Sequence, residues 1–260
     1  MHLIYSYSMS EKLLELKNIT KCYKKQTVLE NVSFSIEKGH VYGFVGENGA
    51  GKTTTLRIIT GLARQTIGTV ELFGESNQKK LSDSRKKMGC MIEHPVFDIS
   101  LDAAENLRLY GLLYGIKELS MIPQLLERTG LGNVGKKKVR DFSMGMKQRL
   151  GIAAALISSP ELLILDEPVN GLDPLGMIEV RKLLTSLNKD DEITILLSSH
   201  ILSELQELAT DYIFISGGKI LNTVSAQEVL TEGMFLEQYY LSLFKDSTQT
   251  NSHKEEDFYA

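Results

Sequence analysis

The sequence predicts an α/β fold that combines a parallel central sheet, an antiparallel region and an inserted run of helices. Two largely apolar segments, 162–165 and 193–197, are typical of central parallel strands that are covered on both faces. Segments 13–19 and 28–36 instead alternate apolar and polar residues, which indicates half-exposed antiparallel strands. From residue 102 to about residue 159, apolar residues recur at helical spacing. With 260 residues, the chain is long enough to bury a large core.

A glycine-rich loop, Gly46 to Thr53, follows the apolar segment 41–45 and precedes a helix that Gly61 ends. It fits the pattern G-x-x-x-x-G-K-[ST], in which backbone N–H groups and a helix N-terminus converge on phosphate oxygens. Lys52 supplies a mobile positive charge, and the Thr53 hydroxyl is a suitable Mg²⁺ ligand. We therefore expect a nucleotide to be bound by Asn48, Gly49, Ala50, Gly51, Lys52, Thr53 and Thr54.

Functional groups follow the two apolar strands. Asp166 and Glu167 come directly after residues 162–165, and His200 follows the second strand. Open α/β sheets bind ligands at the carboxyl ends of their strands. Asp166 is placed to hold Mg²⁺, and Glu167 is the candidate base or water-orienting group. His200 either contacts the γ-phosphate or the water, or is structural.

Composition limits the function classes. The formal net charge is −4, and the short basic run 136–138 is interpreted as a solvated loop, so we expect no nucleic-acid partner. Cys22 and Cys90 lack metal-ligand spacing and indicate a reducing compartment. No apolar stretch approaches the ~20 residues of a membrane span, so we expect a cytoplasmic protein whose link to a membrane runs through a partner.

We expect three segments along the chain. Residues 1–10 form a disordered leader, residues 11–227 form the nucleotide-binding domain with a helical lobe at about 96–160, and residues 228–260 form a C-terminal helix and a polar tail. Tyr23 lies in a polar turn, where it is either a packing residue or a platform for adenine.

These motifs resemble the nucleotide-binding subunit of an ABC transporter from about residue 13 to residue 227. The matching positions, in the family's order, are Tyr23, the loop 46–53, Glu93, the signature Phe142-Ser143-Met144-Gly145-Met146, the segment 162–167 with the following loop 170–174, and His200. The resemblance implies an ABC-type P-loop NTPase fold and Mg-ATP hydrolysis. It also implies that Tyr23 stacks on adenine and that His200 is catalytic.

The resemblance further implies two kinds of partner. Ser143 and the Gly145 backbone would complete the ATP site of a second nucleotide-binding subunit, expected to be a second copy of this chain. A transmembrane permease would hold both at the inner face of the cell membrane. The family docks this partner on the segment equivalent to 95–114, where Phe97, Tyr110 and Tyr114 either line the docking groove or pack within the helical lobe.

Departures from the family pattern narrow the branch. Glu93 replaces the usual glutamine and is implied to approach Mg²⁺ or its water. Met144 and Met146 replace signature residues, and Glu93 followed by Pro95 is similar to bacitracin-resistance and lantibiotic-immunity exporters. The implied function is export of a membrane-active peptide antibiotic, giving resistance or self-immunity. The alternatives are another drug, lipid or polysaccharide as cargo, or a soluble regulatory ABC protein.

Overall fold

The computed structural model describes residues 11–93 and 95–252, and its centre is a six-stranded sheet in the order β5-β6-β7-β3-β8-β9. Five neighbouring strands of this sheet, β5, β6, β7, β3 and β8, are parallel, and β9 runs antiparallel to β8. The strands are β3 (Val41–Val45), β5 (Met88–Met91), β6 (Leu162–Asp166), β7 (Thr194–Ser199), β8 (Asp211–Ser216) and β9 (Lys219–Ser225). Every residue of β3, β6 and β7 is buried, as their apolar sequences predict.

A second, antiparallel sheet has three strands in the order β2-β1-β4. They are β1 (Lys12–Tyr23), β2 (Gln26–Glu37) and β4 (Ile67–Leu72). Leu14 lies opposite Ile36 and Leu16 opposite Phe34, and all four side chains are buried on one face. The alternating sequence thus gives one covered and one partly exposed face. The two sheets together confirm the predicted fold class.

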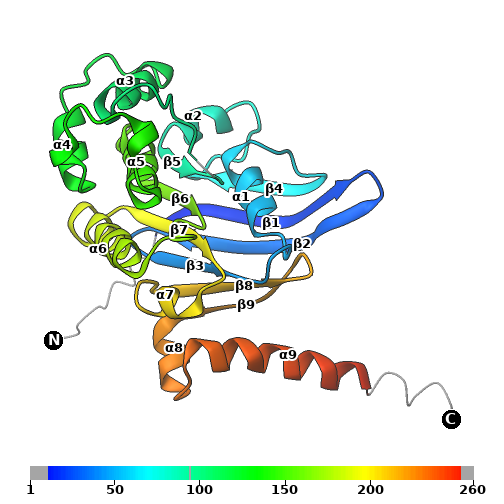
Figure 1. Ribbon diagram of the computed structural model, residues 1–260. Coiled ribbons are helices and arrows are strands. Elements are labelled where there is room, and N and C mark those ends of the chain that lie inside the picture. The colour runs from blue at the N-terminus through cyan, green and yellow to red at the C-terminus, as the bar shows by residue number, and fades with distance from the viewer. Residues whose placement is uncertain (1–10, 94, 253–260) are drawn as a thin grey trace, which may run out of the picture.

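The helices between β5 and β6 form a separate group. Figure 1 shows them gathered beyond the β5 edge of the central sheet. This group contains α3 (Ala103–Leu113), α4 (Ile122–Arg128), the 3₁₀ turns η1 (Gly132–Val134) and η2 (Val139–Asp141), and α5 (Met144–Leu156). Among these, α5 packs directly against β5.

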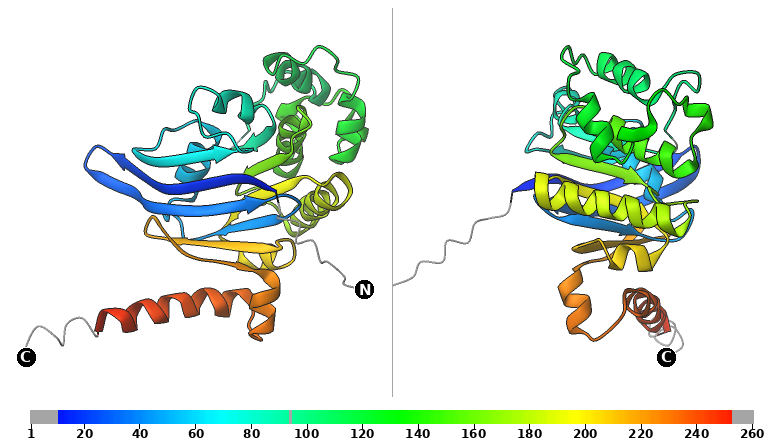
Figure 2. Two further views of the ribbon diagram at one scale, coloured as in Figure 1. Left: turned by 180° about the vertical axis from the view of Figure 1, so that it is seen from behind. Right: turned by 60° about the vertical axis from the view of Figure 1, so that its left-hand side comes forward.

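The remaining helices cover the sheets and the C-terminal side. They are α1 (Lys52–Thr60), α2 (Leu81–Arg85), α6 (Pro174–Asp191), α7 (Leu202–Gln206), α8 (Ala226–Thr231) and α9 (Leu236–Ser252). Figure 2 shows α9 beside the β8–β9 edge of the central sheet. The helix continues to Ser252, beyond the apolar spacing that ends at Leu243. The predicted leader, residues 1–10, lies outside the described residues.

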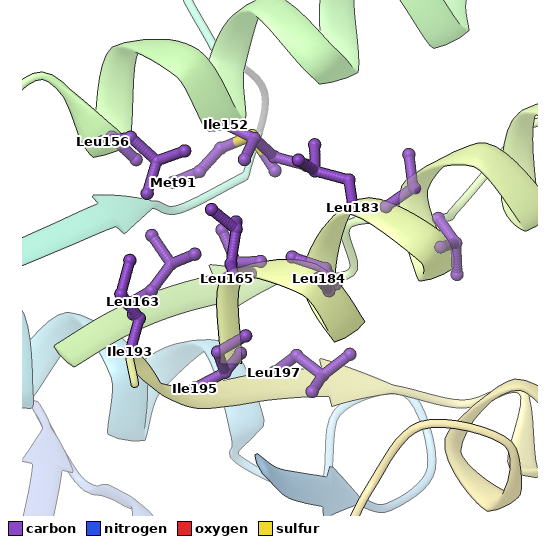
Figure 3. Packing of buried hydrophobic residues seen from close by; sticks show 14 of the residues in the cluster. Met91, Ile152, Leu156, Leu163, Leu165, Leu183, Leu184, Ile193, Ile195 and Leu197 are labelled. Atoms are coloured by element: carbon purple, nitrogen blue, oxygen red, sulfur yellow. The ribbon is translucent and has the colours of Figure 1, made fainter. Parts of the chain in front are cut away.

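The central sheet separates two hydrophobic clusters. Leu163 and Leu165 of β6 point into the cluster shared with α5 and α6, part of which is shown in Figure 3. Leu162 and Ile164 point the other way, into a cluster with α1 and the antiparallel sheet. Successive strand residues face opposite sides, so one short strand supplies both cores. This double packing fixes the end of β6, and with it the acidic pair that follows.

None of the helices in the two described stretches is both long and apolar enough to pass through a bilayer.

Candidate nucleotide site

The phosphate loop connects β3 to α1, and its glycines are required by close packing and backbone conformation. A Cβ atom on Gly46 would lie 2.4 Å from the Ile215 carbonyl oxygen. Gly49 and Gly51 have φ angles of 84° and 112°, in the left-handed region that favours glycine. Gly51 is also the N-cap of α1. The free backbone N–H groups of the first helical turn therefore point beyond the N-terminus of α1, where an anion can bind.

Lys52 lies across this loop and is almost completely buried, with 6% exposure. Its ammonium group donates to the carbonyl oxygen of Gly46 and to that of Glu47 at 3.2 Å. The same nitrogen is 3.6 Å from Oε1 of Glu167. The cation is thus held at the point where the phosphate loop meets the end of β6.

A serine connects the two acids that follow β6. Ser198 of β7 lies beside Asp166 in the parallel register, and its hydroxyl donates to Oδ1 of Asp166 at 2.6 Å. The same hydroxyl oxygen accepts the Glu167 amide at 2.9 Å. Glu167 has a φ angle of 50°, an uncommon conformation for a residue other than glycine. Sequence patterns did not identify Ser198, because its importance depends on the register of two strands.

The side chain of Glu167 is held from two sides. Oε1 faces Lys52, as described, and Oε2 lies 2.8 Å from Nδ1 of His200. His200 follows β7, so the neighbouring parallel strands bring the acid and the imidazole together. The arrangement can orient a carboxylate, and with it a water molecule.

A cavity of about 290 Å³ lies over these groups. It is lined by Val28, Glu47, Asn48, Gly49, Gly51, Lys52, Thr53, Thr54, Glu167, Asn170 and His200. Ala50, also predicted to bind nucleotide, contributes its side chain to the hydrophobic core beneath the loop. Val28 was missed by sequence reasoning, since valine has no distinctive signal outside its folded context. Asn170 lies in the loop 170–174 that matches the family pattern, but the sequence assigned it no role.

Tyr23 lies at the end of β1 and is 44% exposed, as a stacking platform requires. The ammonium group of Lys21 lies 4.5 Å from the centroid of its ring. Tyr23 does not itself line the cavity. An adenine that stacks on this ring would therefore extend beyond the cavity walls or compete with Lys21.

Ser143 and Gly145 are not brought to this cavity. Ser143 is the N-cap of α5, and its side chain accepts the Met146 amide at 3.2 Å. The neighbouring Met144 is 45% exposed, so the signature lies at the surface of the helical group. Any contribution of this segment to a nucleotide site must therefore be made to another molecule.

Glu93 follows β5 with a φ angle of 62°. Its carboxylate forms an ion pair with Arg57 of α1, and both side chains are partly exposed. Within the described residues, no cluster of three or more acidic, histidine or cysteine side chains could enclose a metal by itself.

Comparison with known proteins decides the family. A protein-family profile described as "ABC transporter" matches residues 29–170, more than half of the chain. The chain belongs to the ABC transporter family. The ABC protein "Bacitracin transport ATP-binding protein BcrA" from Bacillus licheniformis is 45% identical over 212 residues, 82% of this chain and 69% of the relative. "Lantibiotic transport ATP-binding protein SrtF" from Streptococcus pyogenes is 46% identical over 209 residues, 80% of this chain and 89% of the relative.

Solved structures agree with this assignment. An ATP-binding subunit of an ABC transporter superposes with a TM-score of 0.79 at 30% identity, covering 89% of this chain and 99% of the other. A dimeric ATP-binding cassette in a post-hydrolysis state, bound to ADP and phosphate, has a TM-score of 0.74 at 26% identity, covering 82% and 99%. This ABC protein therefore binds and hydrolyses ATP.

Proposed function

We propose that this chain is the ATPase subunit of an exporter for a membrane-active peptide antibiotic of the lantibiotic or bacitracin class. Export would give resistance or self-immunity. The names of two relatives more than 40% identical to the chain support this cargo. The observation that carries the catalytic assignment is the convergence of Lys52, Glu167 and His200, from three parts of the chain, on one cavity.

The residues present fit Mg²⁺. Thr53, which carries a hydroxyl, lines the cavity, and Asp166 is the last residue of β6, directly before Glu167. Such hard oxygen donors suit this ion, which typically takes one or two protein ligands beside substrate phosphates and water. When bound, Mg²⁺ neutralises phosphate charge. An approach of Glu93 to the ion would require its ion pair with Arg57 to loosen.

Within this proposal, the phosphate loop and Lys52 bind the phosphates of ATP. Lys52 then exchanges Glu167 for a phosphate oxygen, which releases Oε1 of the acid. His200 continues to hold Oε2, so the free oxygen of Glu167 is oriented toward the attacking water. Ser198 keeps Asp166 and the Glu167 backbone in register.

The proposed assembly contains a second copy of this chain. Ser143 and the N-terminus of α5 are exposed but lie outside the chain's own cavity. Their orientation suits a contribution to the γ-phosphate in a partner's site. ATP would then be bound between two chains, and hydrolysis would allow them to separate.

The proposed permease docks on the helical group and holds this chain at the inner face of the membrane. Phe97 and Tyr110 pack against each other at 5.8 Å and join the core, so lobe packing accounts for two of the three candidate aromatics. Tyr114 is 42% exposed, and Leu112 and Leu113 of α3 are 66% and 83% exposed. These side chains provide an apolar surface suited to helices of a membrane partner.

The variant Glu167→Gln tests the catalytic assignment. It preserves side-chain size but removes the charge that orients water, so we expect ATP turnover to fall by at least about 100-fold. ATP should still bind, and an ATP-bound dimer should accumulate in size-exclusion chromatography with light scattering. Ordinary turnover by the variant would contradict the role of Glu167.

Cargo is tested in cells. The chain is expressed with its neighbouring permease genes in a sensitive Gram-positive host, beside the Glu167→Gln control, and challenged with lantibiotics and bacitracin. Protection that is lost in the control supports peptide export. Equal sensitivity of both strains, with both subunits expressed, would contradict this cargo. A relative 36% identical is named for Nod factor export, so other cargo would be tested next.

A further inference from the structure

The Arg57–Glu93 ion pair connects α1 to the segment after β5. Nη2 of Arg57 donates to Oε1 of Glu93. Arg57 follows Thr53 by one helical turn, so both side chains leave α1 on the same face. The pair therefore places a carboxylate beside the helix that carries the phosphate loop.

Strand register independently places Glu93 at the level of the catalytic acid. Met91 of β5 lies opposite Leu165 of β6 in a parallel pair. Glu93 follows Met91 at the same spacing with which Glu167 follows Leu165. Both glutamates thus lie just beyond the carboxyl edge of the central sheet, where this site receives its ligand.

The charge balance at this edge depends on individual partners. Before ATP binds, Lys52 balances the charge of Glu167, and Arg57 balances that of Glu93. ATP is a polyanion, so a carboxylate without its own cation would repel the phosphates. Lys52 cannot compensate for Glu93 as well, because it is held over the phosphate loop.

We propose that Arg57 is a positioning residue that neutralises and holds Glu93, so that an acid at this point does not weaken nucleotide binding. The inference rests on the proposed function, since it requires ATP phosphates in the cavity. A purely structural role is the competing explanation, because Arg57 lies in the last turn of α1, where a cation interacts favourably with the helix dipole. Such a role would not depend on Glu93.

The full-length chain is compared with Arg57→Gln, Glu93→Gln and the double variant by equilibrium binding of a fluorescent ATP analogue. We expect Arg57→Gln to weaken binding about threefold to tenfold, because Glu93 loses its counter-charge. The double variant should bind within about twofold of Glu93→Gln, because neither chain then carries a carboxylate without its cation at this point. Arg57→Lys, which keeps the charge, should bind within about twofold of the parent.

Two conditions sharpen the test. The Arg57→Gln defect should shrink as salt is raised, because exposed charges are screened. It should grow when EDTA replaces Mg²⁺, because ATP then carries more negative charge. A defect that appears only with Mg²⁺ would mean that Arg57 acts through the ion site, and would overturn the inference.

The double variant decides between charge balance and structure. Restored binding supports the inference, even if Arg57→Gln alone does not fold. A double variant that is unfolded, or that binds as weakly as Arg57→Gln, would overturn it. Unchanged binding by Arg57→Gln would do the same while leaving the ATPase assignment intact. Failure of the parent itself to bind would instead reject the proposed function, and this inference with it.

Discussion

Ser198 shows how one hydroxyl can organise two acids. It donates to the Asp166 carboxylate and accepts the Glu167 amide, and its exposure is 0%. Glu167 has a left-handed backbone conformation, which persists only where surrounding contacts hold it. The hydrogen bond from the Glu167 amide to Ser198 is one such contact, and it helps to set the direction of the Glu167 side chain. Replacing a residue that holds a metal-binding side chain in place typically lowers metal affinity or activity by about 10- to 100-fold.

We expect Ser198→Ala to lower kcat by about tenfold with a smaller change in the KM for ATP, since it disturbs the acids rather than the phosphate loop. Steady-state ATPase kinetics measure this split. Ser199→Ala is the matched control, because Ser199 is equally buried but caps the Ile201 amide. Equal losses of kcat in both variants would show a general packing effect.

At the scale of elements, α3 begins with a reciprocal cap. Oδ1 of Asp102 accepts the Glu105 amide at 2.9 Å, and the Glu105 side chain accepts the Asp102 amide at 2.7 Å. Lys136 lies 3.1 Å from the other oxygen of Asp102, whose side chain is fully buried. One buried acid therefore connects the start of α3 to the loop before α5.

Replacement of Asp102 by alanine should lower the free energy of unfolding by about 1–2 kcal/mol at pH 7, because the cap is lost. Urea denaturation followed by circular dichroism measures the change. The control is Asp83→Ala, which removes an exposed pair with Lys86 and should change stability little. Equal effects of the two substitutions would contradict the importance of the cap.

The stability difference between the parent and Asp102→Ala should depend on pH. Burial raises the pKa of Asp102, but the Glu105 amide and the Lys136 ammonium outweigh it, so this pKa lies below its ordinary value. Stability from a lowered pKa is present above the unfolded value and is lost as pH falls through the folded value. We therefore expect the difference between parent and Asp102→Ala to shrink below about pH 4. A difference that stays constant with pH would exclude this linkage.

At the scale of the molecule, one chain contains one phosphate loop and one exposed signature that do not meet. Ser143 caps α5 and lies outside the chain's own cavity. If two copies close around ATP, a negative charge at this position would face the partner's γ-phosphate. Aspartate and asparagine both retain helix-capping ability, so they separate charge from helix stability.

In a Glu167→Gln background, we expect Ser143→Asp to prevent the ATP-dependent dimer while leaving ATP binding by single chains within about twofold. Ser143→Asn should retain most of the dimer. Light scattering with and without ATP measures the assembly, and analogue binding provides the control. A stable dimer of the Ser143→Asp chain would contradict the proposed contact.

The sequence by itself determined the parts of this ABC protein that depend on neighbouring residues. Alternation predicted the antiparallel strands, apolar runs predicted β6 and β7, and the loop pattern located Gly46 to Thr53. These features are local because strand period, glycine conformation and helix caps act over a few residues.

Only the tertiary structure decided which distant groups meet. Strand register places Ser198 against Asp166, and the packing of α1 on the central sheet brings Arg57 to Glu93. The position of α5 in the helical group leaves Ser143 outside its own chain's cavity. Sequence spacing carries no record of these contacts, because they arise when buried faces of separate elements come together and fix where polar side chains point.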